Sequence, residues 1–244
     1  MAQVLKEAMS FLQHSMDDLT VGAVLQQLAT SFPGAVTFST SFSFEDQVIM
    51  DLIYSSNAAI SIFTLDTGRQ FNETYSTWSR TIEKYGLKIN AFYPDEGELK
   101  EFITESGPNA FYESVDLRKS CCHIRKVVPL KKALRGKAVW VTGLRAQHSP
   151  DRNSLQTLEW DETNQLIKYH PLLHWTTEEV RRYIDDNNVP YNSLHDKGFV
   201  SIGCAPCTRA IKPGEDFRAG RWWWEDASKK ECGLHVHQAA TLSN

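Results

Sequence analysis

Four of the five cysteines in this chain of 244 residues stand in two close pairs, and this arrangement constrains the fold more than any other feature. The first pair is Cys121-Cys122, and the second is the C-x-x-C of Cys204 and Cys207. Neighbouring side chains on a helix point about 100° apart, so adjacent thiolates suit different irons of one cluster better than a single tetrahedral ion. A C-x-x-C beside a glycine and a proline lets two more thiolates converge. We therefore expect a fold in which the two pairs meet at one metal site.

The residue pattern alone leaves the metal open. The spacing matches none of the common ferredoxin runs. An iron–sulfur cluster is favoured, a structural zinc site with four thiolate ligands is the main alternative, and unrelated buried thiols are the third. Cys232 is left over, with two lysines before it and a glycine and a histidine after it. Such a setting lowers a thiol pKa from about 8.5 and favours a nucleophile, although an inert surface cysteine fits equally well.

Length, composition and charge limit the class of protein. With 244 residues, of which 41% are hydrophobic, the chain is long enough for one substantial core. We expect an α/β domain over residues 1–207, followed by a lid and a mobile C-terminal tail over residues 208–244. A net charge of -4 argues against indiscriminate binding to nucleic acid or to an anionic membrane. Residues 1–13 lack the apolar run of a signal peptide and no stretch is long enough to span a bilayer, so we expect a cytoplasmic protein with reduced thiols.

Apolar runs and turn residues predict strands that alternate with helices. Strands are expected at residues 35–38, 60–64, 88–92 and 139–142, and helices at 4–12, 20–31, 47–54, 72–85, 96–106 and 176–187. Two further short runs, 155–160 and 166–169, flank a turn and predict a hairpin. Strands and helices in this order imply a doubly wound parallel sheet.

Polar loops follow the predicted strands, at the edge where an open parallel sheet binds its ligands. The loop Ser39–Asp46 is rich in hydroxyl groups and leads into a helix, which is a geometry that offers N–H and O–H groups to a phosphate. It has no G-x-x-x-x-G-K motif, and a plain strand-to-helix turn capped by Ser43 is the alternative. Arg69 and Arg145 end the loops after the second and fourth strands. Both are candidate anion contacts, and a solvated surface arginine is the alternative for Arg69.

Residues 118–137 carry eight lysines and arginines and no acidic residue. In a chain of net negative charge, this asymmetry predicts a local anion site, although the part after Pro129 also suits an exposed helix face. Arg125 and Lys126 directly follow the first cysteine pair. We expect both to lie within reach of the metal site and of a bound anion.

The segment 208–226 has no clear helical or strand periodicity, and we interpret it as a lid. It contains Trp222-Trp223-Trp224, which either packs the tail against the body or offers an aromatic surface to a partner protein. Residues 149–153 are expected to form a mobile polar loop, and residues 239–244 look disordered.

Taken together, these motifs resemble the assimilatory adenylyl-sulfate reductases of the bacterial iron–sulfur type, within the wider adenylyl- and phosphoadenylyl-sulfate reductase family. The resemblance runs from about Phe38 to His235, and its most specific parts are the two cysteine pairs and Glu231-Cys232-Gly233-Leu234-His235. It implies an adenine nucleotide α-hydrolase-like fold and one [4Fe-4S] cluster per chain. It also implies reduction of adenylyl sulfate to sulfite and AMP by reduced thioredoxin, in sulfate assimilation toward cysteine biosynthesis.

The resemblance implies roles for individual residues as well. Cys232 would be the catalytic nucleophile and would carry an S-sulfo intermediate. The implied cluster ligands are Cys121, Cys122, Cys204 and Cys207. The implied substrate-binding residues are Ser39, Thr40, Ser41, Ser43, Glu45, Asp46, Leu65, Gly68, Arg69, Lys126, Arg145, Arg218 and Arg221. The implied partners are adenylyl sulfate and thioredoxin, with no nucleic acid and no membrane, and a homo-oligomer is compatible with the sequence.

Other functions fit the same residues less well. Phosphoadenylyl-sulfate reductases commonly lack the four cluster cysteines, which favours adenylyl sulfate here, although some cluster-bearing relatives accept both substrates. An ATP-pyrophosphatase-type RNA sulfurtransferase can share the fold and a cluster, but it predicts an S-G-G-x-D-S loop, and Ser39–Phe44 lacks those glycines. In a non-catalytic metal-binding regulator, Cys232 would be dispensable.

Overall fold

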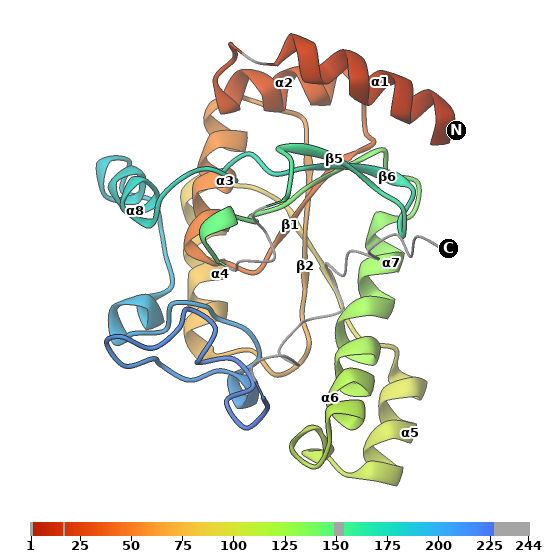
Figure 1. The fold of residues 1–244 in the computed structure, drawn as a ribbon, viewed down its shortest axis with the longest axis vertical. Coiled ribbons are helices and arrows are strands. Elements are labelled where there is room, and N and C mark those ends of the chain that lie inside the picture. Colours follow the sequence, from red (N-terminus) through yellow and green to blue (C-terminus); the bar gives the residue numbers. More distant parts are fainter. Residues whose placement is uncertain (1, 17, 149–153, 227–244) are drawn as a thin grey trace.

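The structure is a computed structural model that describes residues 2–16, 18–148 and 154–226 (Figure 1). The predicted mobile loop at 149–153 and the C-terminal tail with Cys232 therefore lie outside the described residues. Six strands of the described chain form one sheet in the order β3-β2-β1-β4-β6-β5. They are β1 (Val36–Thr40), β2 (Ser61–Leu65), β3 (Ile89–Phe92), β4 (Val139–Val141), β5 (Leu158–Asp161) and β6 (Leu166–Tyr169). All neighbouring strands are parallel except β5 and β6, which form the predicted hairpin.

The helices alternate with the strands along the chain. They are α1 (Ala2–Ser15), α2 (Val21–Ser31), α3 (Phe44–Ser55), α4 (Asn72–Tyr85), α5 (Glu96–Ser106), α6 (Val115–Cys122), α7 (Val128–Leu134) and α8 (Thr177–Asp186). A π-helical turn, His123–Val127, joins α6 to α7. Short 3-10 turns lie at Ala110–Tyr112, Ala146–His148, Ser193–Lys197 and Ala205–Cys207.

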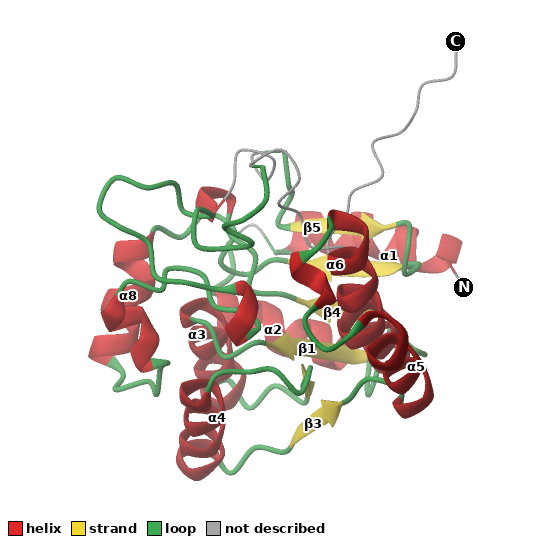
Figure 2. Ribbon diagram, turned by 90° about the horizontal axis from the view of Figure 1, so that it is seen from below, coloured by secondary structure: helices red, strands yellow, loops and turns green. Residues whose placement is uncertain are grey.

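Helices cover both faces of the sheet, as Figures 1 and 2 show with α3 and α4 on one side and α5 and α6 on the other. Alternation along each strand supplies both faces with apolar side chains. On one face, Phe38 and Ile62 pack with residues of α1, α2, α3 and α8 in the main core. On the other face, Phe63 and Trp140 pack against Leu130 and its neighbours on α7. The predicted doubly wound parallel sheet is confirmed.

The order of the strands places a crevice at the centre of the sheet. The chain moves outward from β1 to β2 and β3, and then returns to the other side of β1 with β4. The connection that leaves β1 and the connection that leaves β4 cover opposite faces of the sheet. The loops after these two neighbouring strands therefore diverge and leave a crevice at the carboxyl ends of the strands. The loops Ser41–Ser43 and Thr142–Arg145 follow these two strands directly.

Polar side chains cap the starts of several helices. The Ser43 side chain accepts a hydrogen bond from Asp46 N at the start of α3, and the Thr20 side chain accepts one from Ala23 N at the start of α2. Thr176 and Glu179 form a reciprocal capping box at the start of α8. Each cap satisfies N–H groups that have no partner inside the helix.

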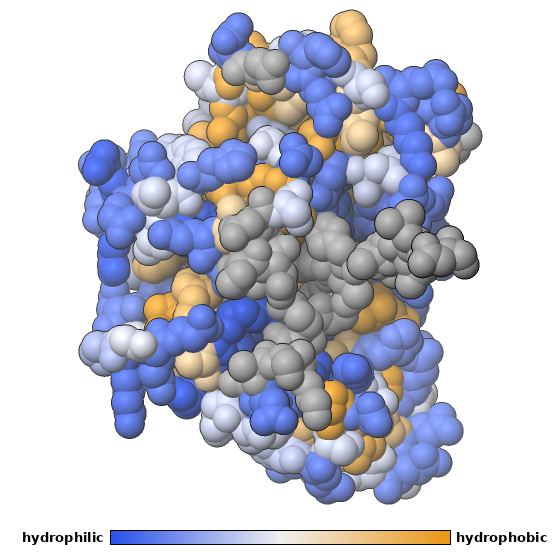
Figure 3. Space-filling model, in the orientation of Figure 1, coloured by the Kyte–Doolittle hydropathy of each residue, from blue (hydrophilic) through white to orange (hydrophobic). Residues whose placement is uncertain are grey.

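None of the described helices is both long enough and apolar enough to span a membrane. Hydrophilic residues dominate the outer parts of the face shown in Figure 3, and apolar residues appear there in separate patches. Phe11 of α1 and Tyr93 after β3 are the most exposed of the large aromatic side chains, at 74% and 58%.

Candidate active site and metal centre

A cavity of about 230 Å³ lies at the crevice beyond β1 and β4. The loop after β1 lines one side together with Thr142, Gly143 and Leu144 after β4. The opposite side comes from residues 200–203 and 217–222. The structure brings together ten of the predicted substrate-binding residues in the lining: Ser39, Thr40, Ser41, Ser43, Glu45, Asp46, Leu65, Lys126, Arg218 and Arg221.

The loop after β1 is held in shape by its own side chains. Asp46 Oδ2 accepts hydrogen bonds from Ser41 N at 2.6 Å and from Ser41 Oγ at 2.7 Å. Phe42 adopts a positive φ of 60°, which is unusual for a residue other than glycine. Its ring is almost fully buried and stacks on Trp78 of α4, with centroids 5.5 Å apart. This packing holds Ser41 and Ser43 at the edge of the cavity.

Glu45 and Asp46 lie next to each other but have opposite electrostatic environments. Burial favours the neutral acid at Glu45, but His148 and Arg145 outweigh it and hold the pKa of Glu45 at about 2. Arg145 Nε and His148 Nε2 lie 2.9 and 3.0 Å from Glu45 Oε1. At Asp46, burial dominates over the hydrogen bonds from Ser41 and raises the pKa to about 6. The loop therefore combines a firmly ionised carboxylate with one that gains its proton near pH 6.

Arg145 is not part of the cavity lining, in contrast to the anion contact expected from its position after β4. Its side chain is only 2% exposed and lies behind the loop against Glu45. The remaining guanidinium N–H groups donate to Gln147 Oε1, to the Trp175 carbonyl and to Thr177 Oγ1. With these partners, Arg145 supports the loop from behind. Gly68 and Arg69 also lie outside this cavity, and Arg69 lines the cysteine pocket.

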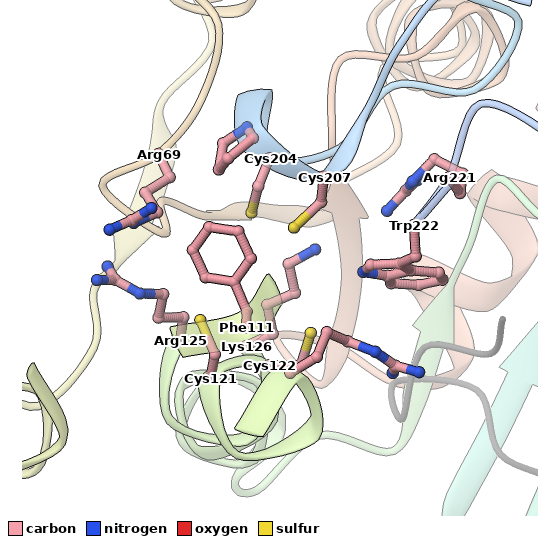
Figure 4. A pocket seen from close by; sticks show the side chains of 12 residues that line it. Arg69, Phe111, Cys121, Cys122, Arg125, Lys126, Cys204, Cys207, Arg221 and Trp222 are labelled. Atoms are coloured by element: carbon pink, nitrogen blue, oxygen red, sulfur yellow. The ribbon is translucent and has the colours of Figure 1, made fainter. Parts of the chain in front are cut away.

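The two cysteine pairs face each other across a second, smaller pocket (Figure 4). Cys121 and Cys122 come from the last turn of α6, and Cys204 and Cys207 come from a 3-10 turn closed by a hydrogen bond from Cys207 N to Cys204 O. Ala205 N donates to Arg69 O at 2.8 Å, which ties this turn to the loop after β2. The predicted meeting of residues 121–122 with residues 204–207 is confirmed.

The charges around the pocket favour thiolate at one cysteine in particular. Burial disfavours the ionised form of Cys204, but Lys126, a hydrogen bond with Thr67 and Arg221 together lower its pKa below the ordinary value. Thr67 Oγ1 lies 3.2 Å from Cys204 Sγ. By contrast, burial raises the pKa of Cys207 to about 12, with Cys204 acting in the same direction. Metal ligands must be thiolates, and the nearby positive groups favour that form at Cys204, whereas burial raises the pKa of Cys121 and Cys207.

A single zinc ion and a four-iron cluster require different arrangements of their four thiolate ligands. In the part of the chain that the structure describes, no three Cys, His, Asp or Glu side chains converge closely enough to hold a single ion. A zinc ion with Zn–S bonds of about 2.3 Å would draw its four thiolates to roughly 3.8 Å from one another. Each thiolate of a four-iron cluster binds a different iron, and the ligands are spread accordingly. Two cysteine pairs on opposite walls of one pocket are compatible with four ligands that each bind a different iron.

Three residues line both pockets: Lys126, Arg221 and Trp222. Lys126 and Arg221 both lower the pKa of Cys204, so their charges act on the thiols as well as on the larger cavity. Arg221 packs directly over Gly203, where any Cβ would collide with the guanidinium. Trp222 is 1% exposed, and the guanidinium groups of Arg118 and Arg221 lie 4.7 and 4.9 Å from its ring. The wall between the two pockets is therefore cationic and one side chain thick.

Sequence reasoning missed several residues of the site. His148 lines the cavity, contacts Glu45 and stacks on Phe217, with ring centroids 4.3 Å apart. Trp140 lines it from β4, and its Nε1 donates to Ser39 Oγ at 2.8 Å. The alternation of β4 could have placed Trp140 on the face opposite Val139 and Val141, but no local signal links His148 to Glu45.

Comparisons with known proteins agree with one another. The phosphoadenosine phosphosulfate reductase domain family matches residues 35–210. An adenosine 5'-phosphosulfate reductase of Agrobacterium fabrum is 48% identical over 203 residues, which are 83% of this chain and 78% of that protein. A phosphoadenylyl-sulfate reductase of Candida auris, solved with phosphate, superposes with a TM-score of 0.71 at 27% identity and covers 84% of this chain and 97% of that one. Candida glabrata FMN adenylyltransferase, with 16% identity, a TM-score of 0.53 and coverage of 92% and 73%, shares the fold. The predicted adenine nucleotide α-hydrolase-like fold is confirmed.

Proposed function

Because the chain belongs to the phosphoadenosine phosphosulfate reductase domain family, we propose that it reduces adenylyl sulfate to sulfite and AMP, with a thioredoxin-type dithiol as the reductant. The observation that carries this proposal is the cationic wall of Lys126, Arg221 and Trp222 between a nucleotide-sized cavity and four facing cysteines. The activity belongs to sulfate assimilation toward cysteine, and we place it in the cytoplasm.

The nucleotide would bind with its phosphate beside the loop after β1. Ser39, Thr40 and Ser43 supply hydroxyl groups there, at the start of α3, and Ser41 lies between them with its N–H and O–H donated to Asp46. A helix N-terminus and free N–H groups favour a bound anion. Lys126, Arg218 and Arg221 lie across the cavity and would hold the sulfate end. Gly68, Arg69 and Arg145 were predicted to bind the substrate as well, but Arg69 lines the cysteine pocket and Arg145 is buried against Glu45.

The first chemical step would be nucleophilic substitution at sulfur. The thiolate of Cys232 attacks the sulfate sulfur, and the bond from sulfur to the bridging oxygen breaks. AMP leaves with that electron pair, and the product is an S-sulfocysteine. Negative charge grows on the leaving phosphate and the sulfo oxygens, which fixed cations such as Lys126 and Arg221 stabilise. Cys232 lies outside the described residues, and its assignment rests on the sequence motif.

The second step needs a partner dithiol. One of its thiolates attacks the sulfur of Cys232, sulfite leaves with the electron pair, and a mixed disulfide forms. The second thiol of the partner then attacks its own bonded sulfur, which releases the Cys232 thiol and leaves an oxidised partner. The dithiol supplies both electrons, so no other electron donor is needed.

Cys121, Cys122, Cys204 and Cys207 would hold one [4Fe-4S] cluster. When bound, the cluster would supply a fixed charge and tie α6 to the turn at Ala205–Cys207. The residues beside the cysteines are already held without it: Arg125 Nη1 donates to Thr67 O at 2.6 Å, and Lys126 lies among the cysteines in Figure 4 and also lines the larger cavity.

A direct assay tests the substrate. Sulfite release from adenylyl sulfate and from its 3'-phosphorylated form would be compared with thioredoxin present. We expect a much higher kcat/KM for adenylyl sulfate, because the four cysteines resemble that group of enzymes. The likeness to the Candida auris enzyme favours the 3'-phosphorylated form as the second candidate. Equal kcat/KM values would indicate dual specificity, and activity with neither substrate would refute the proposal.

Intact mass spectrometry tests the nucleophile. With adenylyl sulfate and no dithiol, the protein should gain one sulfo group on Cys232 and release one AMP. The Cys232→Ser variant should keep its iron and bind AMP but form no adduct. Sulfite produced by the serine variant, or an adduct on another residue, would contradict the mechanism.

A further inference from the structure

A buried ion pair joins the helix of the first cysteine pair to the end of the described chain. Arg118 lies on α6, one helical turn before Cys121. Its Nε donates to Glu225 Oε1 at 2.9 Å and its Nη2 donates to Glu225 Oε2 at 2.7 Å. This fork-on-fork geometry fixes the direction of both side chains as well as their distance.

The pair is almost completely hidden from water. The side chains of Arg118 and Glu225 are 1% and 3% exposed, whereas the Arg209–Glu215 pair in the same part of the chain is 35% and 31% exposed. Removal of water from two charges is expensive, so a buried pair adds little net stability compared with apolar residues of similar volume. Its geometry is better explained by a need to hold Glu225 in one place.

The backbone around Glu225 is tied to the cysteine pocket. Trp222 N donates to Cys207 O at 3.2 Å, and Glu225 N donates to Trp222 O at 2.9 Å. Trp224 packs on Tyr112, just before α6, with ring centroids 4.5 Å apart. Arg118 completes these contacts and also lies over the Trp222 ring. The chain is therefore held up to Glu225 against the elements that carry all four cysteines.

The number of residues between Glu225 and Cys232 limits how far apart the two can lie. Cys232 stands seven positions after Glu225, so their Cα atoms can be at most about 25 Å apart. We propose that the Arg118–Glu225 pair is the anchor that fixes the end of the described chain beside the cysteine pocket, and that it thereby sets the point from which the chain continues to Cys232. Arg118 and Glu225 are thus positioning residues for the first chemical step. The inference rests on the proposed role of Cys232.

The anchor is tested by the rate of one half-reaction. The Glu225→Gln variant keeps the shape of the side chain and removes its charge, and Glu225→Asp keeps the charge on a shorter side chain. Adduct formation on Cys232 would be followed by quenched-flow intact mass spectrometry with excess adenylyl sulfate and no dithiol. We expect the rate to fall by about 10-fold in Glu225→Gln, within the roughly 100-fold that a 1 Å misplacement can cause. Glu225→Asp should be intermediate.

Three controls separate positioning from loss of structure. AMP affinity should stay within two-fold of the unaltered protein in both variants, since neither residue lines the larger cavity. Iron content should also stay within two-fold, because Arg118 itself, which lines the cysteine pocket, is unchanged in both variants. Glu215→Gln makes the same chemical change at the exposed pair with Arg209 and should leave the rate unchanged. A Glu225→Gln protein that forms the adduct at the normal rate would refute the anchor, and so would a rate loss that merely follows lost iron or lost AMP binding. If the unaltered protein forms no Cys232 adduct, the proposed function itself fails.

Discussion

The two sides of the larger cavity are held in place by different kinds of bonds. The strand wall consists of Ser39–Asp46, at and after the end of β1, and of Thr142–Leu144, directly after β4. The parallel hydrogen bonds between β1 and β4 hold this wall in place. The loop wall, residues 200–203 with 217–222, contains no strand and only the isolated bridge between Thr208 and Arg221. It is held by contacts such as Arg209 N to Gly220 O and by side chains around the cysteine pocket. The strand wall should therefore keep its shape without metal, and the loop wall should not.

The largest effect is expected from a change at the cysteine pocket. The Cys122→Ser variant should lose iron and all measurable sulfite production together, because a hydroxyl group is a poor ligand for a cluster. Its loop wall should also become sensitive to limited proteolysis, while the fragment with the sheet stays intact. Iron analysis of the unaltered protein, prepared without oxygen, should give about four irons per chain. A colourless protein with one stoichiometric zinc would contradict this expectation.

A smaller effect is expected from the packing under the strand wall. Phe42→Ala removes a buried ring that stacks on Trp78, and such changes lower the free energy of unfolding by about 3–5 kcal/mol. Urea unfolding measures the loss, and AMP affinity should fall with it because Ser41 and Ser43 lose their support. Phe11→Ala is the matched control, since Phe11 is 74% exposed and its loss should leave both quantities unchanged. Reduced AMP affinity without reduced stability would show that the ring acts on the ligand directly.

The smallest effect is a difference in pH dependence within the strand wall. The pKa of Asp46 is raised from 3.8 to about 6, so its contribution to stability is full below pH 4 and is lost as the pH rises through about 6. Glu45, with its pKa lowered to about 2, contributes stability above pH 4.5 that disappears as the pH falls toward 2.

The Asp46→Asn variant separates the two carboxyl groups. It should remove a decrease of up to about 3 kcal/mol in the free energy of unfolding between pH 4 and 6. Urea midpoints of both proteins, measured across this range, give the difference directly. The decrease in the free energy of unfolding that Glu45 causes as the pH falls below 4.5 should remain in this variant. If the two curves stay parallel from pH 4 to pH 7, Asp46 does not titrate in this range.

The same contrast explains how much of the fold was predictable. Strands such as Val36–Thr40 and helices such as Thr177–Asp186 carry their signals locally, in alternation, periodicity and caps, and were found within a few residues. Residues 188–226 have few such signals, because their shape depends on contacts like that of Arg118 with a residue 107 positions away. The lid was therefore predicted only as an irregular segment.

The site was predictable to the extent that residue type alone carries chemistry. The four cysteines and the Ser39–Asp46 loop were singled out by residue type, and the structure brings each group to the lining of one pocket. Arg145 shows the limit of such reasoning. Its charge suits an anion, but its partner Glu45 lies 100 residues earlier, and only the folded chain reveals that the two neutralise each other. His148 was missed for the same reason.

The π-helical turn at His123–Val127 limits how the length of this chain can change. Its wide turn, closed by Val128 N to His123 O, holds one residue more than an α-helical turn. The extra residue therefore rotates the cysteine pair by about 100° around the helix axis relative to the core-facing Leu130. Pro129, whose ring would clash with the carbonyl four residues earlier in a continuous helix, follows this turn directly. Insertion or deletion of a single residue here would turn either the cysteine pair or Leu130 away from its place, so length variation among homologues should avoid residues 121–130 and collect in the outer loops.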